Sequence, residues 1–192
     1  MLAYVLVATT IFSLAPVMAG SANAQTVTLD SLQGAEISTR VRFSGTFRSA
    51  KGTGPGTIVV THQIRVGPGE ALEVKYARTA TAHTPVGDKT GTLARNLSGK
   101  IGTPGKAVDS NFVWLLQGDE LVNLNVREVG GFKTTITFEG PAEKLQCKVT
   151  STYVPEVGAG PGKTTSAARG GKVEILNQRQ TASDCKVNHR RS

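Results

Sequence analysis

The sequence is poor in the residues that build most active sites. It holds three histidines, two cysteines and one tryptophan, and no two histidines have the HxH or HxxxH spacing of a metal site. A Gly-x-Ser-x-Gly nucleophile motif is also missing. These absences predict a protein with no catalytic residues, no cofactor and no metal, and they favour a function other than catalysis.

One glycine-rich stretch, residues 158–164, has part of the phosphate-loop pattern. That pattern requires a glycine five positions before Gly162, and Val157 stands there instead. Further glycines follow at Gly170 and Gly171, where the motif requires a helix. We therefore interpret residues 155–171 as a Gly-rich loop between two strands, of a length that is usually mobile or functional.

Aromatic residues are also scarce, at 5% of the chain, whereas the formal net charge is +8. A basic excess attracts polyanions such as acidic polysaccharides or a charged envelope surface, although it can also serve solubility alone. Proteins that bind single-stranded nucleic acid need aromatic side chains on which bases stack. We therefore expect no nucleic-acid partner.

Charged residues are absent from the first 24 positions. Residues 2–14 form an apolar run, and Ala22-Asn23-Ala24 has the small-x-small form of a signal-peptidase site. We predict a signal peptide over residues 1–24 and one domain over residues 25–192, located in the periplasm or outside the cell. An uncleaved anchor is the alternative, but the apolar run is short for a span. After cleavage we expect no transmembrane span.

Only two cysteines are present, Cys147 and Cys185. An even number in an exported chain predicts a disulfide between them. By chain-entropy reasoning, closing this loop contributes roughly 4 kcal/mol.

Strong alternation of apolar and polar residues is the main structural signal. Between Ala35 and Arg48 the odd positions are mostly apolar and the even positions are polar, the period of a half-buried strand. Similar segments recur at residues 57–66, 71–77, 121–129, 132–138, 144–154 and 172–178, and residues 89–101 alternate weakly. Residues 111–116 form a short apolar run, and residues 25–32 are a lead-in that could be a strand. The segments 49–56 and 79–89 contain glycine and proline and are predicted as loops. No segment has a convincing helical period. The pattern predicts an all-β antiparallel sandwich or distorted barrel of about eight or nine strands.

The polar face of the first strand carries the candidate binding residues Arg40, Arg42 and Arg48. Arg40 and Arg42 are two positions apart, about 6.5–7 Å along one face of the strand. Two guanidinium groups at this distance can hold a sulfate, phosphate or carboxylate pair. The other interpretation is a solvated face with cross-strand acidic partners such as Glu36 or Glu73.

Two further features are interpreted as structural. His62 lies on the apolar face of a predicted strand, where a single histidine is more often a core residue than a ligand. The basic C-terminal tail, residues 186–192, is expected to be disordered.

Three short motifs resemble a known layout: Leu32-Gln33-Gly34 before a long strand, GGKVEI at residues 170–175, and the late Cys185. Together they are similar to small secreted or periplasmic bacterial β-rich proteins of no assigned function. The resemblance implies an exported β-protein and supplies no active-site residues.

The sequence therefore favours an exported, non-enzymatic binding or structural module for an anionic polysaccharide. One alternative is a small-ligand carrier with an apolar barrel interior lined by Phe43, Trp114 and Phe138. The other is an enzyme or enzyme inhibitor that uses residues 155–171.

Overall fold

The computed structural model defines most of the predicted domain. It describes residues 27–49, 52–102, 105–107, 110–126, 131–154, 164–168 and 171–189. The predicted signal peptide, residues 1–24, lies outside this set. Within the described residues, no helix has the length and apolar character needed to cross a membrane.

Two antiparallel sheets form a sandwich rather than a closed barrel. The long sheet has the order β10-β11-β1-β2-β3-β4. Its strands are β1 (Ala35–Ser49), β2 (Gly52–Val66), β3 (Ala71–Thr84), β4 (Gly87–Lys100), β10 (Thr164–Ala168) and β11 (Gly171–His189). The short sheet has the order β5-β6-β7-β8-β9. Its strands are β5 (Gly105–Ala107), β6 (Ser110–Gln117), β7 (Glu120–Val126), β8 (Gly131–Glu139) and β9 (Gln146–Val154).

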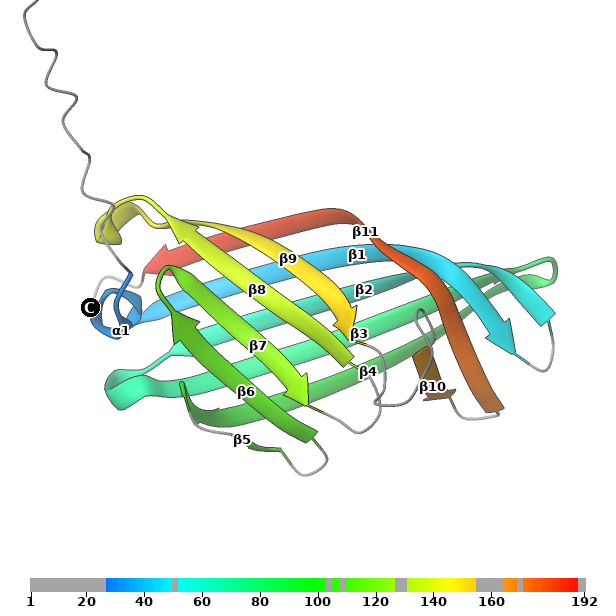
Figure 1. Ribbon diagram of the computed structural model, residues 1–192, viewed down its shortest axis with the longest axis horizontal. Helices are drawn as coiled ribbons and strands as arrows, with labels where there is room; N and C mark the ends of the chain where they lie inside the picture. Colours follow the sequence, from blue (N-terminus) through cyan, green and yellow to red (C-terminus); the bar gives the residue numbers. More distant parts are fainter. Residues whose placement is uncertain are drawn as a thin grey trace, which may run out of the picture.

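The sandwich confirms the predicted fold class. Nine strands contain at least seven residues, and β5 and β10 are short additions at the sheet edges. The short sheet lies against one half of the long sheet, and β1, β2, β3 and β4 continue beyond it (Figure 1). The long sheet therefore has one face turned toward the short sheet, the inner face, and one turned away from it, the outer face.

In the described part of the chain, helical structure is limited to single turns: α1 (Leu29–Leu32), η1 (Pro68–Glu70) and η2 (Ala142–Lys144). The sequence suggested a strand before Gly34, but α1 forms there because Thr28 and Ser31 make a capping box. The Ser31 amide donates to Thr28 Oγ1 at 3.2 Å, and the Thr28 amide donates to Ser31 Oγ at 3.0 Å. The turn places Leu32 in the core, fully buried.

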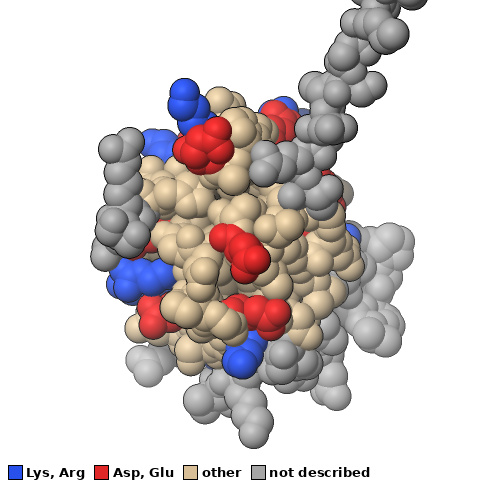
Figure 2. Space-filling model, turned by 90° about the vertical axis from the view of Figure 1, so that its left-hand side faces the viewer, with Lys and Arg blue, Asp and Glu red and all other residues tan. Residues whose placement is uncertain are grey.

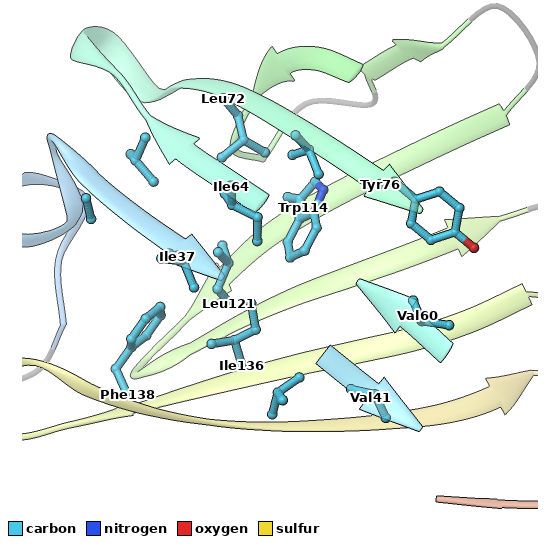
Figure 3. Close-up of a cluster of buried hydrophobic side chains, with 14 of the residues drawn as sticks. Ile37, Val41, Val60, Ile64, Leu72, Tyr76, Trp114, Leu121, Ile136 and Phe138 are labelled. Atoms are coloured by element: carbon cyan, nitrogen blue, oxygen red, sulfur yellow. The ribbon is translucent and has the colours of Figure 1, made fainter. Parts of the chain in front are cut away.

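The core lies between the sheets and follows the predicted alternation. Ile37, Val41, Phe43 and Phe47 of β1 are all less than one-tenth exposed. Figure 3 shows side chains from both sheets meeting in this layer, including Ile37, Val41, Val60, Ile64, Leu72, Tyr76, Trp114, Leu121, Ile136 and Phe138. Burial of such side chains removes them from water and is the main force that holds the two sheets together.

Two segments predicted as loops are strands instead. Residues 52–56 belong to β2, and residues 79–84 and 87–89 extend the β3–β4 hairpin to a two-residue turn. Their apolar signal is weak because glycine, alanine and threonine dominate them. They are strands because residues 52–56 pair with β1 from Gly45 to Ser49, and β3 pairs with β4 along its whole length.

Strand β11 is also longer than predicted. It runs from Gly171 to His189, so Lys186 to His189 form its last residues rather than a disordered tail. The cause is β1, whose second edge pairs with β11 from Ala35 to Arg48. Within the predicted loop at residues 155–171, the structure describes Thr164–Ala168 as β10, paired with β11, and Gly171 as the start of β11. Residues 155–163, 169–170 and 190–192 lie outside the described set.

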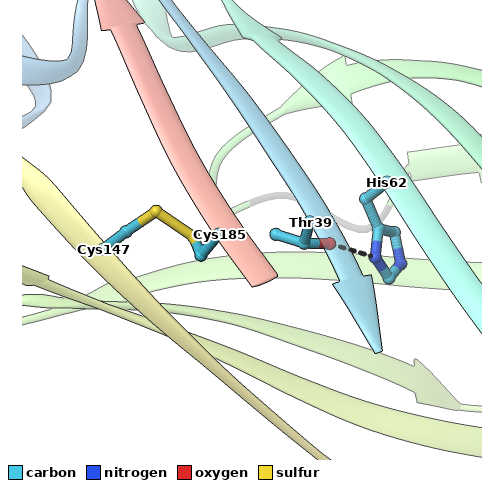
Figure 4. The surroundings of a disulfide bond; sticks show 4 residues. All are labelled: Thr39, His62, Cys147 and Cys185. Atoms are coloured by element: carbon cyan, nitrogen blue, oxygen red, sulfur yellow. Dashed lines mark hydrogen bonds between the residues drawn. A yellow bond between two sulfur atoms is a disulfide. The ribbon is translucent and has the colours of Figure 1, made fainter. Parts of the chain in front are cut away.

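The predicted disulfide joins the two sheets. Cys147 of β9 and Cys185 of β11 are bonded, with their Cα atoms 5.5 Å apart (Figure 4). The same pair of strands is linked by a hydrogen bond in which the Ser151 amide donates to Gln180 Oε1 at 2.9 Å. The edge of β9 is therefore fastened to β11 by one covalent bond and one polar contact.

Replacing both cysteines by serine should lower the free energy of unfolding by roughly 4 kcal/mol, because the unfolded chain loses a cross-link that spans 38 residues. Urea unfolding of the oxidised protein, the reduced protein and the double variant measures this change. A reducing agent should destabilise the native chain and leave the double variant unaffected. Equal unfolding midpoints for all samples would contradict the prediction.

A second prediction concerns Gly56, over which the ring of Phe47 lies. A Cβ atom at Gly56 would collide with that ring and come within 2.7 Å of the Thr81 carbonyl oxygen. Gly56→Ala should therefore cost about 2 kcal/mol of stability through overpacking. Gly91→Ala is the control, since nothing lies within 4 Å of its added Cβ. That variant should be neutral or slightly stabilised in thermal unfolding.

Candidate functional site on the outer face of the long sheet

The pairing of β11 with β1 contains two irregularities. The register shifts once between Arg42 and Phe43 and again between Ser44 and Thr46, so β11 has one extra residue at each place. At the first shift Thr181 is unpaired, and its Oγ1 donates to the Arg42 carbonyl oxygen at 3.2 Å. At the second, Asn177 has a positive φ of 54°, a conformation that asparagine tolerates. Both are β-bulges, which often redirect side chains near functional sites.

The first bulge decides where Arg179 points. Cys185 pairs with Thr39 on the inner face, so an unbroken alternation would place Arg179 on that face too. Because Thr181 is an extra residue, Gln180 takes the inner position opposite Phe43, and Arg179 lies opposite Ser44 on the outer face. Arg179 is exposed, and its Nε donates to Ser44 Oγ at 3.3 Å.

Arg179 therefore joins two of the arginines predicted from the sequence. Arg40 and Arg42 are exposed on the same face, and Arg42 is the diagonal neighbour of Arg179, about 7–8 Å away in a regular ladder. We call Arg40, Arg42 and Arg179 the arginine patch. Lys186 also lies on this face, opposite Ser38, and Asp184 lies opposite Arg40.

Two of the acidic residues near the patch are engaged elsewhere, whereas Asp184 lies directly opposite Arg40. Glu36 accepts a hydrogen bond from Arg65 Nη2 at 2.9 Å, and Glu73 lies 3.9 Å from Arg65 Nη1. Within the described part of the chain, the side chains of Arg40 and Arg42 form no ion pair or hydrogen bond. Two guanidinium groups therefore remain available to an anion.

Arg48, the third predicted residue, is not part of this patch. It lies on the same face of β1, but six residues from Arg42, which is about 20 Å along an extended strand. Its side chain is exposed, and it already interacts with another group. The sequence prediction grouped the three arginines by the strand face that they share and did not take their spacing along the strand into account.

Threonine hydroxyl groups lie on the same outer face, on β3 and β4, beyond β2 from the arginine patch. The Oγ1 atoms of Thr79 and Thr92 lie 3.2 Å apart, and those of Thr81 and Thr90 lie 3.0 Å apart in the next row. No Phe, Tyr or Trp of the described residues lies on this face. The surface therefore offers charge and hydrogen bonds but no aromatic platform.

A shallow groove of about 430 Å³ lies at the end of the molecule, where α1 meets η1. Its walls carry the acidic residues Asp30 and Glu70. Figure 2 shows this end of the molecule, with acidic side chains across it and basic side chains toward the rim. These carboxylates disfavour an anionic ligand, so the groove and the arginine patch suit different partners.

The inner face of the long sheet contains a buried histidine. His62 is 2% exposed, shares a hydrogen bond of 3.1 Å between Nδ1 and Thr39 Oγ1 (Figure 4), and has ring contacts to Tyr76 and Trp114. Burial lowers the pKa of His62 from 6.5 to about 4, because desolvation penalises the charged imidazolium. This agrees with the interpretation of His62 as a core residue.

The facing sheet contributes further buried polar groups at the same level. Asn123, Thr134 and Ser151 are paired across β7, β8 and β9, and the hydroxyl groups of the last two lie 3.0 Å apart. Trp114 Nε1 and Asn123 Nδ2 are buried donors without a hydrogen-bond partner among the described residues. No carboxylate is among the buried residues that the structure describes, so this layer presents no acid–base pair.

Known proteins provide no further guide to function: no family model, no curated protein and no solved structure matches the chain. In the described residues, no group of three or more His, Cys, Asp or Glu side chains could hold a metal ion. Of the arrangements described above, the arginine patch on the outer face is therefore the one best suited to binding a ligand.

His62 should make stability depend on pH. Its pKa is lower in the folded state than in the unfolded state, so protonation favours unfolding. The stability that neutral His62 contributes is fully present above pH 6.5. This contribution, about 3 kcal/mol, is lost as the pH falls from 6.5 to about 4. Urea unfolding at several pH values measures this slope.

His62→Gln should remove the His62 part of that pH dependence, although it also changes stability at neutral pH. His83→Gln is the control, because His83 is 42% exposed on the β3–β4 hairpin. That variant should keep the loss between pH 6.5 and 4. An unchanged slope in His62→Gln would contradict the assignment.

Proposed function

We propose that the protein is an exported binding module that holds an acidic polysaccharide on the outer face of its long sheet. The observation that carries the proposal is that the guanidinium groups of Arg40 and Arg42, beside Arg179, form no ion pair or hydrogen bond with any described side chain. Arginine binds sulfate and carboxylate groups through two parallel N–H donors, which favours a polymer that carries such groups.

The surroundings of the patch support a sugar polymer over a nucleic acid. The threonine rows supply hydroxyl groups that can exchange hydrogen bonds with sugar hydroxyls. Bases would require aromatic stacking partners, and no described Phe, Tyr or Trp lies on this face. An extended sheet surface also suits a linear polymer better than a small molecule, which prefers a concave pocket.

The two alternatives have less support. A carrier needs a barrel interior, whereas the sheets form a sandwich, and Phe43, Trp114 and Phe138 are packed within its core. An enzyme needs converging catalytic groups, and the only buried residue of the described set that can carry a positive charge, His62, has no buried carboxylate beside it. Export itself is supported by the apolar leader in the sequence and by the disulfide.

Retention on an immobilised sulfated polysaccharide such as heparin tests the proposal. The native protein should be retained at low ionic strength and released by salt, because exposed charge pairs are screened. Arg40→Gln/Arg42→Gln should weaken binding about tenfold, as expected for two exposed ionic contacts of up to about 1 kcal/mol each. A titration with soluble polysaccharide gives the dissociation constants.

Arg65→Gln is the matched control. It removes a positive charge from the same face, but from a guanidinium already paired with Glu36. Polysaccharide binding should weaken much less in Arg65→Gln than in the single variant Arg42→Gln, which removes one positive charge from the patch. Equal losses in the two variants would show that only total charge matters, and no retention of the native protein at low salt would refute the proposal.

A further inference from the structure

Strand β4 forms an open edge of the long sheet. It is the last strand in the sheet order, and among the described strands it pairs only with β3, residue by residue from Gly87 to Lys100. Along this length most residues are exposed, and only Leu93, Arg95 and Leu97 are half-buried. A strand of 14 residues therefore presents its second row of backbone N–H and C=O groups to a partner.

Two of the structural features that often protect an edge are missing from β4. It contains no proline, and its pairing with β3 has no bulge. Two cations, Lys89 and Arg95, lie on its inner face, opposite Ala82 and Tyr76. Charges at an edge discourage pairing when like charges meet, but they also select the register in which they do not.

We propose that β4 pairs with β4 of a second copy of this chain, antiparallel about a two-fold axis that passes through Ala94. In this register each charged end of the strand meets the opposite charge. Asp88 of each copy lies opposite Lys100 of the other copy. The remaining outer-face pairs are polar or small: Thr90 opposite Ser98, Thr92 opposite Asn96, and Ala94 opposite itself. Asp88 uses Oδ1 to contact His83 Nδ1 at 2.9 Å, which leaves its second oxygen for Lys100.

Neighbouring registers place the charged residues of the two strands less favourably. In an antiparallel ladder, two residues that face each other direct their N–H and C=O groups either both across the gap or both away from it, so the two-fold axis must pass through a residue. An axis through Thr92 would place Lys89 opposite Arg95, and an axis through Arg95 would place Arg95 opposite itself. An axis through Leu93 leaves Asp88 opposite Ser98. Among axes from Thr92 to Arg95, only Ala94 pairs opposite charges.

The dimer would join two long sheets into one continuous outer face. The two copies of β1 would then be separated by seven strand spacings, about 34 Å. Both arginine patches would face the same side, so one polymer chain could contact both and gain avidity without new contacts. The pairing itself needs no ligand and does not depend on the proposed function.

Light scattering after size-exclusion chromatography, without ligand, tests the proposal over a wide range of protein concentration. The mature protein should shift from the mass of one chain to that of two as concentration rises. Ala94→Lys places two ammonium groups across the axis and should keep the protein monomeric. Asn96→Lys is the matched control: it adds the same charge two residues away, opposite Thr92, and should still dimerise.

A charge exchange tests the register. Asp88→Lys and Lys100→Asp should each weaken the dimer about tenfold, because each creates two like-charge pairs. The double variant Asp88→Lys/Lys100→Asp should restore it. A native protein that stays monomeric at every concentration, a dimer insensitive to Ala94→Lys, or a double variant that is not rescued would each overturn the proposal. Circular dichroism confirms that every variant is folded.

Discussion

The alternation of side chains along a strand is the constraint on which this structure depends. In β1, the central strand of the long sheet, each step of one residue moves a side chain from the core to the solvent. Ile37, Val41 and Phe43 are buried for this reason, and Arg40 and Arg42 are exposed for the same reason. The core face and the arginine face are two faces of one strand, so a shift in register would damage both.

One extra residue in β11 changes this alternation, and the change forms the arginine patch. Thr181 reverses the alternation, which sends Arg179 outward and Gln180 inward. Gln180 then accepts a hydrogen bond from the Ser151 amide of β9, close to the disulfide between the same two strands. The bulge therefore serves the outer surface and the closure of the sandwich together. Local charge pairing then decides what the surface can bind: Arg65 takes Glu36 and Glu73, and the patch stays positive.

The sequence predicted the features that depend on strong local patterns. The fold class, the core face of β1 and the disulfide followed from alternation and from an even cysteine count. The tip of the β3–β4 hairpin was missed because Thr79, Thr81 and Gly87 carry little apolar signal, and they become strand only through pairing with neighbours. Arg179 was missed because a bulge is defined by the partner strand. Its only local sign is the break in alternation between Asn177 and Thr181.

The edge strands β9 and β4 differ in how their open edges are protected, and this difference has a physical meaning. At β9 the open edge is closed by Gln180 and by the covalent bond to β11. At β4, which is longer than β9, no described side chain performs this task, and its cations lie where they oppose only some registers. Unprotected edges are a hazard that folded proteins usually remove. The edge of β4 is open over 14 residues and has complementary charges at its two ends. A partner strand therefore explains this edge better than an edge that stays unpaired.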